Sequence, residues 1–260
     1  MAMVHDAGTT AVMMATPCDI EDLAIGFALT EGIIRSAADI RRLDIVDAPL
    51  GVEARMWLAG SQSAQLAARR RFVAGPTGCG LCGVDSLREA VRPLAKVAAD
   101  LRLTADDVHA GLAALSRAQD LGAATRAAHA AAWWTPADGL GPVREDVGRH
   151  NALDKLAGAL ARDGRPFPRE AGAVFLTSRV SIEMIQKAVM IGAQTIVAIS
   201  APTALAVRAA EQSGVTLIAI ARQDGFMVFS HPERLDVDET GLQAAGGPSG
   251  LTVASAETSR

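Results

Sequence analysis

Ala173-Val174-Phe175-Leu176-Thr177 opens the stretch of sequence that decides the fold. It is apolar at every position except the last, which is typical of a strand buried on both faces. Ser181–Ile191 then repeats apolar residues at helical spacing, and Thr195–Ile199 returns to a nearly continuous apolar run. A buried strand, a helix and a second buried strand form the repeating unit of a parallel sheet.

The same alternation continues towards the C-terminus. The sequence predicts a helix over Thr203–Gln212, a strand over Thr216–Ala221 and, after a short turn, another strand over Phe226–Phe229. We therefore expect an α/β fold with a largely parallel C-terminal sheet that helices cover on both faces. The last stretch is rich in Gly, Ser, Ala and Thr, and we expect a flexible tail over 237–260.

The pattern upstream of this sheet is shorter and more mixed. Thr16 and Pro17 are typical of the N-cap and first residue of a helix, which Gly32 would end. Short alternating runs predict strands, over 10–15, 39–47 and 53–59. Two more helices are predicted, over 85–98 and Thr104–Gln119. We divide the chain into an α+β part over 1–100 and an α/β part over 101–236.

Composition excludes several classes of protein. Half of the 260 residues are hydrophobic, which is enough for a large core, and the net charge of −4 argues against a general nucleic-acid binder. No apolar run reaches the roughly 18 residues of a membrane span, and the N-terminus lacks the pattern of a signal peptide. Three cysteines, two of them spaced C-x-x-C, suit a reducing compartment. We expect a soluble, cytoplasmic protein with no membrane or nucleic-acid partner.

Gly78-Cys79-Gly80-Leu81-Cys82-Gly83 has the clearest chemistry in the sequence. Its glycines keep the backbone open and leave both thiols reachable. A helix that begins near Asp85 would bring its positive end close to the cysteines and favour the thiolate, which is the reactive form. Thiol chemistry, either redox or sulfur transfer, is one interpretation of this loop.

Other kinds of site use the same residue types. Half of a zinc site is one, but no second C-x-x-C and no H-x-x-x-H completes it, and we expect no bound metal ion. A zinc deaminase also needs H-x-E, which is absent. The glycines spell G-x-G-x-x-G, yet the preceding residues 69–72 do not resemble a buried strand. Two cysteines that only pack in a turn are the last alternative.

A second informative stretch is Arg144-Glu145-Asp146-Val147-Gly148-Arg149-His150-Asn151-Ala152-Leu153-Asp154-Lys155. Among its first eight residues the only large apolar side chain is Val147, which is unusual for a surface helix. We interpret these eight as a loop that enters a helix, whose apolar spacing starts at Ala152. Dense polarity before a helix N-terminus suits an anion or nucleotide site, and a solvated turn is the alternative.

Polar residues also gather where the predicted strands lead into helices. Ser178 and Arg179 follow the first strand, Ser200 and Thr203 follow the second, and Arg222 follows the third. Ligands of open α/β sheets bind at the carboxyl ends of the strands. The sequence therefore predicts a ligand site at this edge of the sheet.

These motifs together resemble the FdhD-type sulfurtransferases, which are accessory proteins of formate dehydrogenase. The resemblance covers nearly the whole chain. It rests on Thr16-Pro17, Glu21–Phe27, Glu31–Ile34, Cys79–Gly83, Glu145–Lys155, Ser178–Met184 with Lys187-Ala188, and Ser200–Thr203 with Leu205–Val207.

The resemblance implies a three-layer, cytidine-deaminase-like fold with the smaller N-terminal α+β part, in a homodimer. It implies that a cysteine desulfurase places persulfide sulfur on Cys79, with Cys82 assisting. The sulfur would pass to the molybdenum bis(molybdopterin guanine dinucleotide) cofactor, which activates formate dehydrogenase. A cofactor-binding chaperone without sulfur transfer and a zinc-stabilised interaction domain are the alternatives.

The resemblance also implies cofactor contacts. Arg149, Lys155 and Arg179 would meet phosphates, together with helix starts near Ser181 and Thr203. Glu145 and Asp146 would orient basic groups or accept hydrogen bonds from guanine. The other expected contacts are His129, His150, Asn151, Ser178, Ser200 and, near the guanine end, the turn Ile220-Ala221-Arg222-Gln223-Asp224-Gly225.

Two departures from the family pattern stand out. The family motif Thr-Gly-Gly-x-His-Ala-Ala is matched here by Thr125–Ala131, in which Arg126 and Ala127 replace the glycines and His129 is kept. A Cβ disturbs any positive φ or close ligand approach, so we expect weaker cofactor binding, with a new phosphate contact from Arg126 as the alternative. The family's opening strand is reduced to Val4-His5-Asp6, so we expect that an edge strand is missing or shortened.

Overall fold

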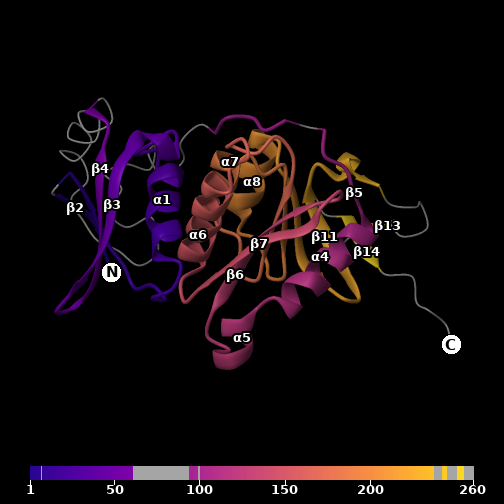
Figure 1. Cartoon of the computed structure of the whole chain (residues 1–260). Helices are drawn as coiled ribbons and strands as arrows, with labels where there is room; N and C mark the ends of the chain where they lie inside the picture. Colours follow the sequence, from indigo (N-terminus) through magenta and orange to yellow (C-terminus); the bar gives the residue numbers. More distant parts are fainter. Residues whose placement is uncertain (7, 61–93, 99, 237–241, 245–250, 255–260) are drawn as a thin grey trace.

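The computed structural model describes residues 1–260 except 7, 61–93, 99, 237–241, 245–250 and 255–260. The described chain forms a four-stranded sheet, an eight-stranded sheet and a two-stranded pair, with helices between and around them (Figure 1). None of the helices in these residues combines the length and apolar character needed to cross a membrane. The predicted mixed α/β class is confirmed.

The N-terminal part contains β1 (Ala2–His5), β2 (Gly8–Val12), α1 (Ile20–Thr30), β3 (Ile40–Ala48) and β4 (Gly51–Leu58). Its strands pair in the order β2-β1-β4-β3. Val4 and His5 belong to β1, which pairs with both β2 and β4, so the shortened opening still supplies a strand. Apolar side chains of this sheet and of α1, including Met3, Leu23 and Met56, form one core cluster.

The remaining elements begin with β5 (Leu103–Thr104), α4 (Ala105–Arg117), α5 (Asp120–Thr125), β6 (His129–Thr135), β7 (Gly139–Asp146) and α6 (Arg149–Arg162). They continue with β8 (Ala173–Leu176), α7 (Ile182–Met190), β9 (Thr195–Ala198), α8 (Ala204–Ser213), β10 (Thr216–Arg222) and β11 (Gly225–Ser230). The last strands are β12 (Leu235–Asp236), β13 (Leu242–Ala244) and β14 (Leu251–Ala254).

The eight-stranded sheet has the order β13-β14-β11-β10-β9-β8-β6-β7. Only β8, β9 and β10 pair in parallel, and every other neighbour is antiparallel. The parallel region is therefore narrower than predicted. Short turns join β6 to β7 and β10 to β11, and strands joined by a short turn run antiparallel. Strands β13 and β14 extend the sheet from residues that we expected to form a flexible tail.

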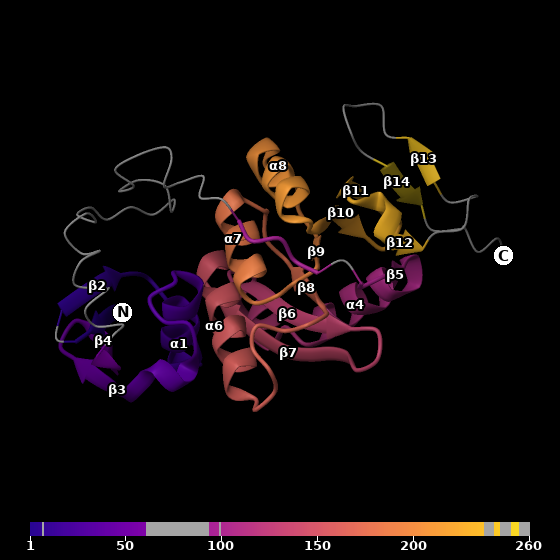
Figure 2. The same ribbon diagram turned by 90° about the horizontal axis from the view of Figure 1, so that it is seen from above.

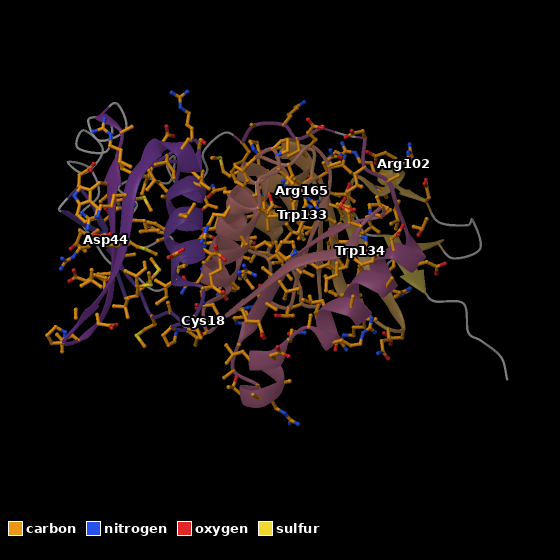
Figure 3. The ribbon with its side chains drawn as sticks, viewed as in Figure 1. Cys18, Asp44, Arg102, Trp133, Trp134 and Arg165 are labelled. Atoms are coloured by element: carbon orange, nitrogen blue, oxygen red, sulfur yellow. The ribbon has the colours of Figure 1, made fainter. Side chains whose placement is uncertain are left out.

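Helices cover both faces of this sheet (Figure 2). Helices α6, α7 and α8 pack on one face around a cluster that includes Trp133, and α4 packs on the other around a cluster that includes Trp134. These consecutive residues of β6, both labelled in Figure 3, belong to core clusters on opposite faces of the sheet, as strand geometry requires. Helix α1 lies against the outer side of α6, and the N-terminal sheet lies beyond it.

The contact between α1 and α6 is unusually close because both helices carry a glycine there. A Cβ on Gly26 would lie 1.7 Å from the backbone oxygen of Asp154, and one on Gly158 would lie 2.0 Å from that of Asp22. Any side chain at either position would push the helices apart. This seam fixes the N-terminal part on the α/β part, so the predicted division near residue 100 separates two parts that share an interface.

Two predicted helices need correction. Helix α1 begins at Ile20 rather than at Pro17, because Thr16 is engaged elsewhere: its N–H donates to Asp146 and its hydroxyl accepts from the N–H of Val147. Residues 94–98 have no regular structure, although we predicted a helix over 85–98. The rest of that helix, together with the loop of Cys79 and Cys82, lies outside the described residues.

Candidate functional site

Residues 144–151 do not form the loop that we expected before the helix. The first three of them belong to β7, and α6 starts at Arg149 after the N-cap Gly148. The polar side chains then divide into two sets. The side chains of one set are buried and form hydrogen bonds or ion pairs within the protein. Arg149 and His150, at the start of α6, instead have buried atoms with no hydrogen-bond partner among the described residues.

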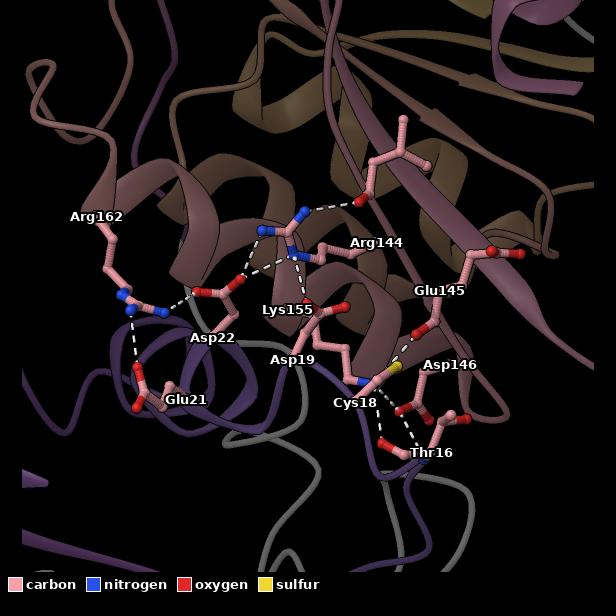
Figure 4. A network of polar contacts seen from close by, with 11 residues as sticks. Thr16, Cys18, Asp19, Glu21, Asp22, Arg144, Glu145, Asp146, Lys155 and Arg162 are labelled. Carbon is pink, nitrogen blue, oxygen red and sulfur yellow. Dashed lines mark hydrogen bonds and ion pairs between the residues drawn. The ribbon is translucent and has the colours of Figure 1, made fainter. Parts of the chain in front are cut away.

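Lys155 and Asp146 form the centre of the engaged set (Figure 4). Both side chains are completely buried, with Nζ of Lys155 2.7 Å from Oδ2 of Asp146. Nζ also donates to the backbone oxygens of Thr16 and Glu145, each at 3.1 Å. The ammonium is therefore used by protein oxygens, and a phosphate contact from Lys155 stays a prediction that would need a rearrangement.

Asp146 organises the segment in front of α1 as well. Its carboxylate accepts from the N–H of Thr16, the N–H of Gly148 and the amide of Asn151. The Asn151 amide also donates to the backbone oxygen of Met14. These hydrogen bonds connect the chain before α1 to the β7–α6 junction, so Asp146 and Asn151 have a structural role.

Glu145 holds α5 in place. Its two carboxylate oxygens accept from the N–H groups of Leu121 and Gly122, at 2.8 and 2.7 Å. These N–H groups lie in the first turn of α5 and have no partner within that helix. Glu145 thereby positions the segment that leads to Arg126 and His129.

A second buried network joins α7 to the seam. Nζ of Lys187 donates to Thr30, Glu31 and both oxygens of Asp154, at 2.9 to 3.1 Å. Burial works against the ammonium, but the carboxylates of Asp154 and Glu31 outweigh it and raise the pKa of Lys187. At the rim of the seam, Asp22 bridges Arg144 and Arg162 (Figure 4).

Some of the buried side-chain atoms without a partner among the described residues are scattered, as in His109 and Trp134, but four belong to the N-termini of α6 and α7, and we call this place the α6–α7 corner. Its members are Arg149, His150, Ser181 and Glu183. The corresponding atoms, Nε, Nε2, Oγ and Oε2, are buried and have no hydrogen-bond partner among the described residues. Buried polar atoms are nearly always paired in native proteins, so this corner is the strongest candidate for a ligand site in the described chain.

Electrostatics at the corner favours an anion. Burial, together with the charges of Arg149 and Lys187, lowers the pKa of His150 to about 4, so the ring is neutral at physiological pH. Burial and the charges of Arg149 and Arg179 lower the pKa of His129. The charge of Arg149 therefore acts on both rings, His150 in α6 and His129 at the start of β6. Three members of the corner, Arg149, His150 and Ser181, are predicted cofactor contacts, and they come from two separate stretches of the sequence.

The corner lies at the carboxyl ends of the parallel strands, as predicted. Ser178 and Arg179 follow β8, and Ser200 and Thr203 follow β9. Arg179 is exposed, whereas Ser178 is buried and donates to the backbone oxygen of Arg179. Thr203 caps α8 through its hydroxyl. Within the described residues, neither Gly148 nor Ser181 caps its helix with a side chain, so the first N–H groups of α6 and α7 have no side-chain cap.

The turn 220–225 carries a backbone outlier. Ile220 has φ 53°, which is rare for a β-branched residue, and the β10–β11 register shifts at this point. The N–H of Ile220 donates to the backbone oxygen of Ser200, which links the turn to the end of β9. Ala221 is buried, whereas the side chains at the tip of the turn are exposed: Arg222, Gln223 and Asp224. Gly225 begins β11.

Arg126 adopts the backbone that a glycine would adopt more easily. It is the C-cap of α5, with φ 53°, and its side chain is exposed. The expected conflict between a Cβ and a positive φ is therefore present at Arg126, and Ala127 does not share it. Whether the change weakens cofactor binding stays a prediction.

The remaining cysteine, Cys18, precedes α1 and is exposed (Figure 3). Its Sγ lies 3.8 Å from Nζ of Lys155. Among the residues that the structure describes, no group of three or more His, Cys, Asp or Glu side chains is arranged to hold a metal ion. Cys79 and Cys82, the predicted reactive pair, remain predictions.

Sequence reasoning missed two polar residues at the corner and the seam. Glu183 and Lys187 lie in a helix that we predicted correctly, and both were quoted only as part of a motif. Their burial is the missing signal: a Glu and a Lys four residues apart normally indicate an exposed ion pair. Instead, Lys187 forms ion pairs with Asp154 and Glu31, and Oε2 of Glu183 is buried without a partner among the described residues.

Comparisons with known proteins identify the family of the chain. The model of the FdhD/NarQ family matches residues 1–236. "Sulfur carrier protein FdhD" of Agrobacterium fabrum is 45% identical over 240 residues, covering 90% of this chain and 86% of its own. Its namesake from Brucella abortus is 51% identical over 236 residues, covering 90% of this chain and 87% of its own.

A solved structure extends the likeness to the fold. It is the crystal structure of a protein from Desulfotalea psychrophila that is named as a formate dehydrogenase accessory protein. It superimposes with a TM-score of 0.70 at 27% identity, covering 90% of this chain and 88% of its own. By the extent and identity of these matches, the chain belongs to the FdhD/NarQ family.

Proposed function

We propose that this chain is a cytoplasmic sulfur carrier that serves a formate dehydrogenase. It takes sulfur from a cysteine desulfurase as a persulfide on Cys79. It delivers the sulfur to the molybdenum bis(molybdopterin guanine dinucleotide) cofactor, which is its substrate, and it acts as a homodimer. The observation that carries the proposal is identity of 45 to 51% to proteins named as sulfur carriers over 90% of the chain.

The first step of the chemistry needs only a thiolate. The sulfur of Cys79 attacks the outer sulfur of the desulfurase persulfide, so that a new S–S bond forms and the donor's S–S bond breaks. The donor cysteine leaves as a thiolate, and the outer sulfur keeps its proton. Cys82 assists by hydrogen bonding, or by displacing the sulfur as hydrosulfide when it forms a disulfide with Cys79.

The α6–α7 corner supplies the binding half of the function. Arg149, Arg179 and the N–H groups of two helix N-termini suit the phosphates of a dinucleotide. The unpartnered Nε of Arg149 and Oγ of Ser181 are donors of the kind that phosphate oxygens accept. The fit supports the cofactor as the ligand of this corner.

Mass spectrometry tests the sulfur-transfer step directly. The protein is incubated with a cysteine desulfurase and cysteine, and the intact mass and a digest are measured. We expect one added sulfur atom on the peptide that contains Cys79, and none in Cys79→Ala. Activation of formate dehydrogenase by Cys79→Ala at the wild-type level would rule out this role. Cofactor binding without added sulfur would favour the chaperone alternative.

A further inference from the structure

The carboxylate of Glu183 is the one member of the α6–α7 corner that an anion does not explain. Arg149, His150 and Ser181 offer N–H or O–H groups to phosphate oxygens. A carboxylate can only accept hydrogen bonds and repels a phosphate at close range. Even so, Oε2 of Glu183 is buried there without a partner.

Helix stability alone does not account for this carboxylate. Glu183 lies in the first turn of α7, where a negative charge is favourable. An exposed side chain achieves that effect, whereas a buried acceptor without a partner costs about 1–3 kcal/mol. Lys187, four residues further on, does not compensate Glu183, because its ammonium is held by Thr30, Glu31 and Asp154.

Glu183 lies in the first turn of α7, two residues after Ser181 of the corner. Its charge acts on His150 and opposes the effect of Arg149 on the same ring. Helix α7 packs against α6, so the acceptor of Glu183 and the hydroxyl of Ser181 belong to the helix start beside the one that carries Arg149 and His150. A ligand that fills this space meets positive groups and one acceptor together.

We propose that Glu183 accepts a hydrogen bond from the neutral part of a nucleotide whose phosphates bind Arg149 and the helix N-termini. The donor is a ribose hydroxyl or a base N–H group, which share the same chemistry towards a carboxylate. Glu183 thereby selects a nucleotide over a bare diphosphate. This inference rests on the proposed function, in which the substrate carries two guanine nucleotides.

Calorimetry with GDP and inorganic pyrophosphate tests the selection. The wild-type protein is compared with Glu183→Gln and with Glu211→Gln, which removes the same charge from an exposed position on α8. We expect Glu183→Gln to weaken GDP binding about tenfold, since hydrogen bonds to charged groups are the stronger ones. We expect the same variant to tighten pyrophosphate binding about threefold, because a nearby like charge is lost. Glu211→Gln should change neither.

Two further ligands identify the donor. 2′-Deoxy-GDP lacks one ribose hydroxyl, and IDP lacks the amino group of guanine. The group that contacts Glu183 is the one whose removal weakens binding to the wild-type protein but not to Glu183→Gln.

Opposite shifts for GDP and pyrophosphate support the inference. Shifts in the same direction overturn it, because a merely structural role or a folding defect would weaken both ligands. A wild-type protein that binds neither ligand overturns the inference and the proposed cofactor site together. The persulfide measurement on Cys79 is independent of these results, so the two proposals fail separately.

Discussion

The α1–α6 seam and the α6–α7 corner share the helix α6, but they differ in whether their buried polar groups have hydrogen-bond partners. At the seam, Asp146, Asp154 and Lys155 are engaged by neighbouring protein atoms. At the corner, Arg149 and His150 hold buried atoms with no partner in the described chain. The seam therefore satisfies its buried polar groups from within the protein, whereas the corner holds the ligand site that we propose.

The largest expected effect breaks the seam. Lys155→Met removes the partner of a fully buried carboxylate, Asp146, and should lower the free energy of unfolding by about 3–5 kcal/mol. Urea denaturation measures the loss. Lys96→Met, at an exposed position, serves as the control. A Lys155→Met variant as stable as the control would mean that the pair contributes nothing to the seam.

The corner responds to pH. Because the folded protein lowers the pKa of His150 to about 4, protons bind preferentially to the unfolded chain between that value and the ordinary 6.5. Above about pH 6.5 the ring is neutral in both states, and its protonation costs the folded state nothing. The free energy of unfolding then decreases as the pH falls from about 6.5 towards 4. We expect the wild type to lose about 2–3 kcal/mol more than His150→Gln between pH 7 and 4.5 in urea denaturation. Parallel losses in the two proteins would contradict a buried neutral ring.

Arg149→Ala tests the ligand side of the corner. We expect GDP binding to weaken about ten- to a hundredfold, which corresponds to a lost charge-assisted contact of about 1.5–3 kcal/mol. The stability of the protein should change little, because Nε has no protein partner to lose. Arg208→Ala, an exposed position on α8, is the matched control in calorimetry. An unchanged dissociation constant would give Arg149 a structural role.

Gly158→Ala tests the close approach of the two helices. The added Cβ meets backbone atoms of Asp22, which cannot move as a flexible side chain does. We expect a loss of about 1–3 kcal/mol in thermal or urea unfolding. In Gly141→Ala the nearest atom would be 3.4 Å away, so this control should unfold near the wild-type midpoint. Equal midpoints for both variants would show that α1 can shift without cost.

The smallest expected effect concerns Arg126. Arg126→Gly relieves a positive φ and should raise stability by about 0.5–1 kcal/mol, after allowance for the freer unfolded chain. The double reversion Arg126→Gly with Ala127→Gly should also tighten GDP binding if the Cβ atoms obstruct the ligand. Weaker binding would mean that Arg126 contacts a phosphate. No change would place the segment, with His129, away from the site.

Much of the fold was predictable because its signals are local. The buried strands at 173–176 and 195–198 follow from continuous apolar runs, and the Thr104 cap follows from its spacing to Asp107. The start of α1 was not predictable, because Asp146, 130 residues away, engages Thr16. Tertiary bonds of this kind override a local cap signal.

The candidate site was predictable in its location and less so in its parts. The carboxyl ends of parallel strands and the polar stretch before α6 both pointed to the corner. The sequence did not separate the engaged residues Glu145 and Lys155 from the unpartnered Arg149. For Lys155 that division depends on which side of α6 faces α1, and therefore on Gly26 and Gly158, and for Glu145 it depends on the approach of α5 to β7.

The two consecutive tryptophans of β6 provide intrinsic fluorescence probes on the two faces of the eight-stranded sheet. Trp133 lies in the core under α6, α7 and α8, Trp134 lies in the core under α4, and the third tryptophan, Trp57, lies on the N-terminal sheet beside Arg42. The chain has three tryptophans and no tyrosine, so its emission comes from these side chains alone. Variants that keep a single tryptophan would therefore show whether the three layers unfold in one cooperative event or one after another.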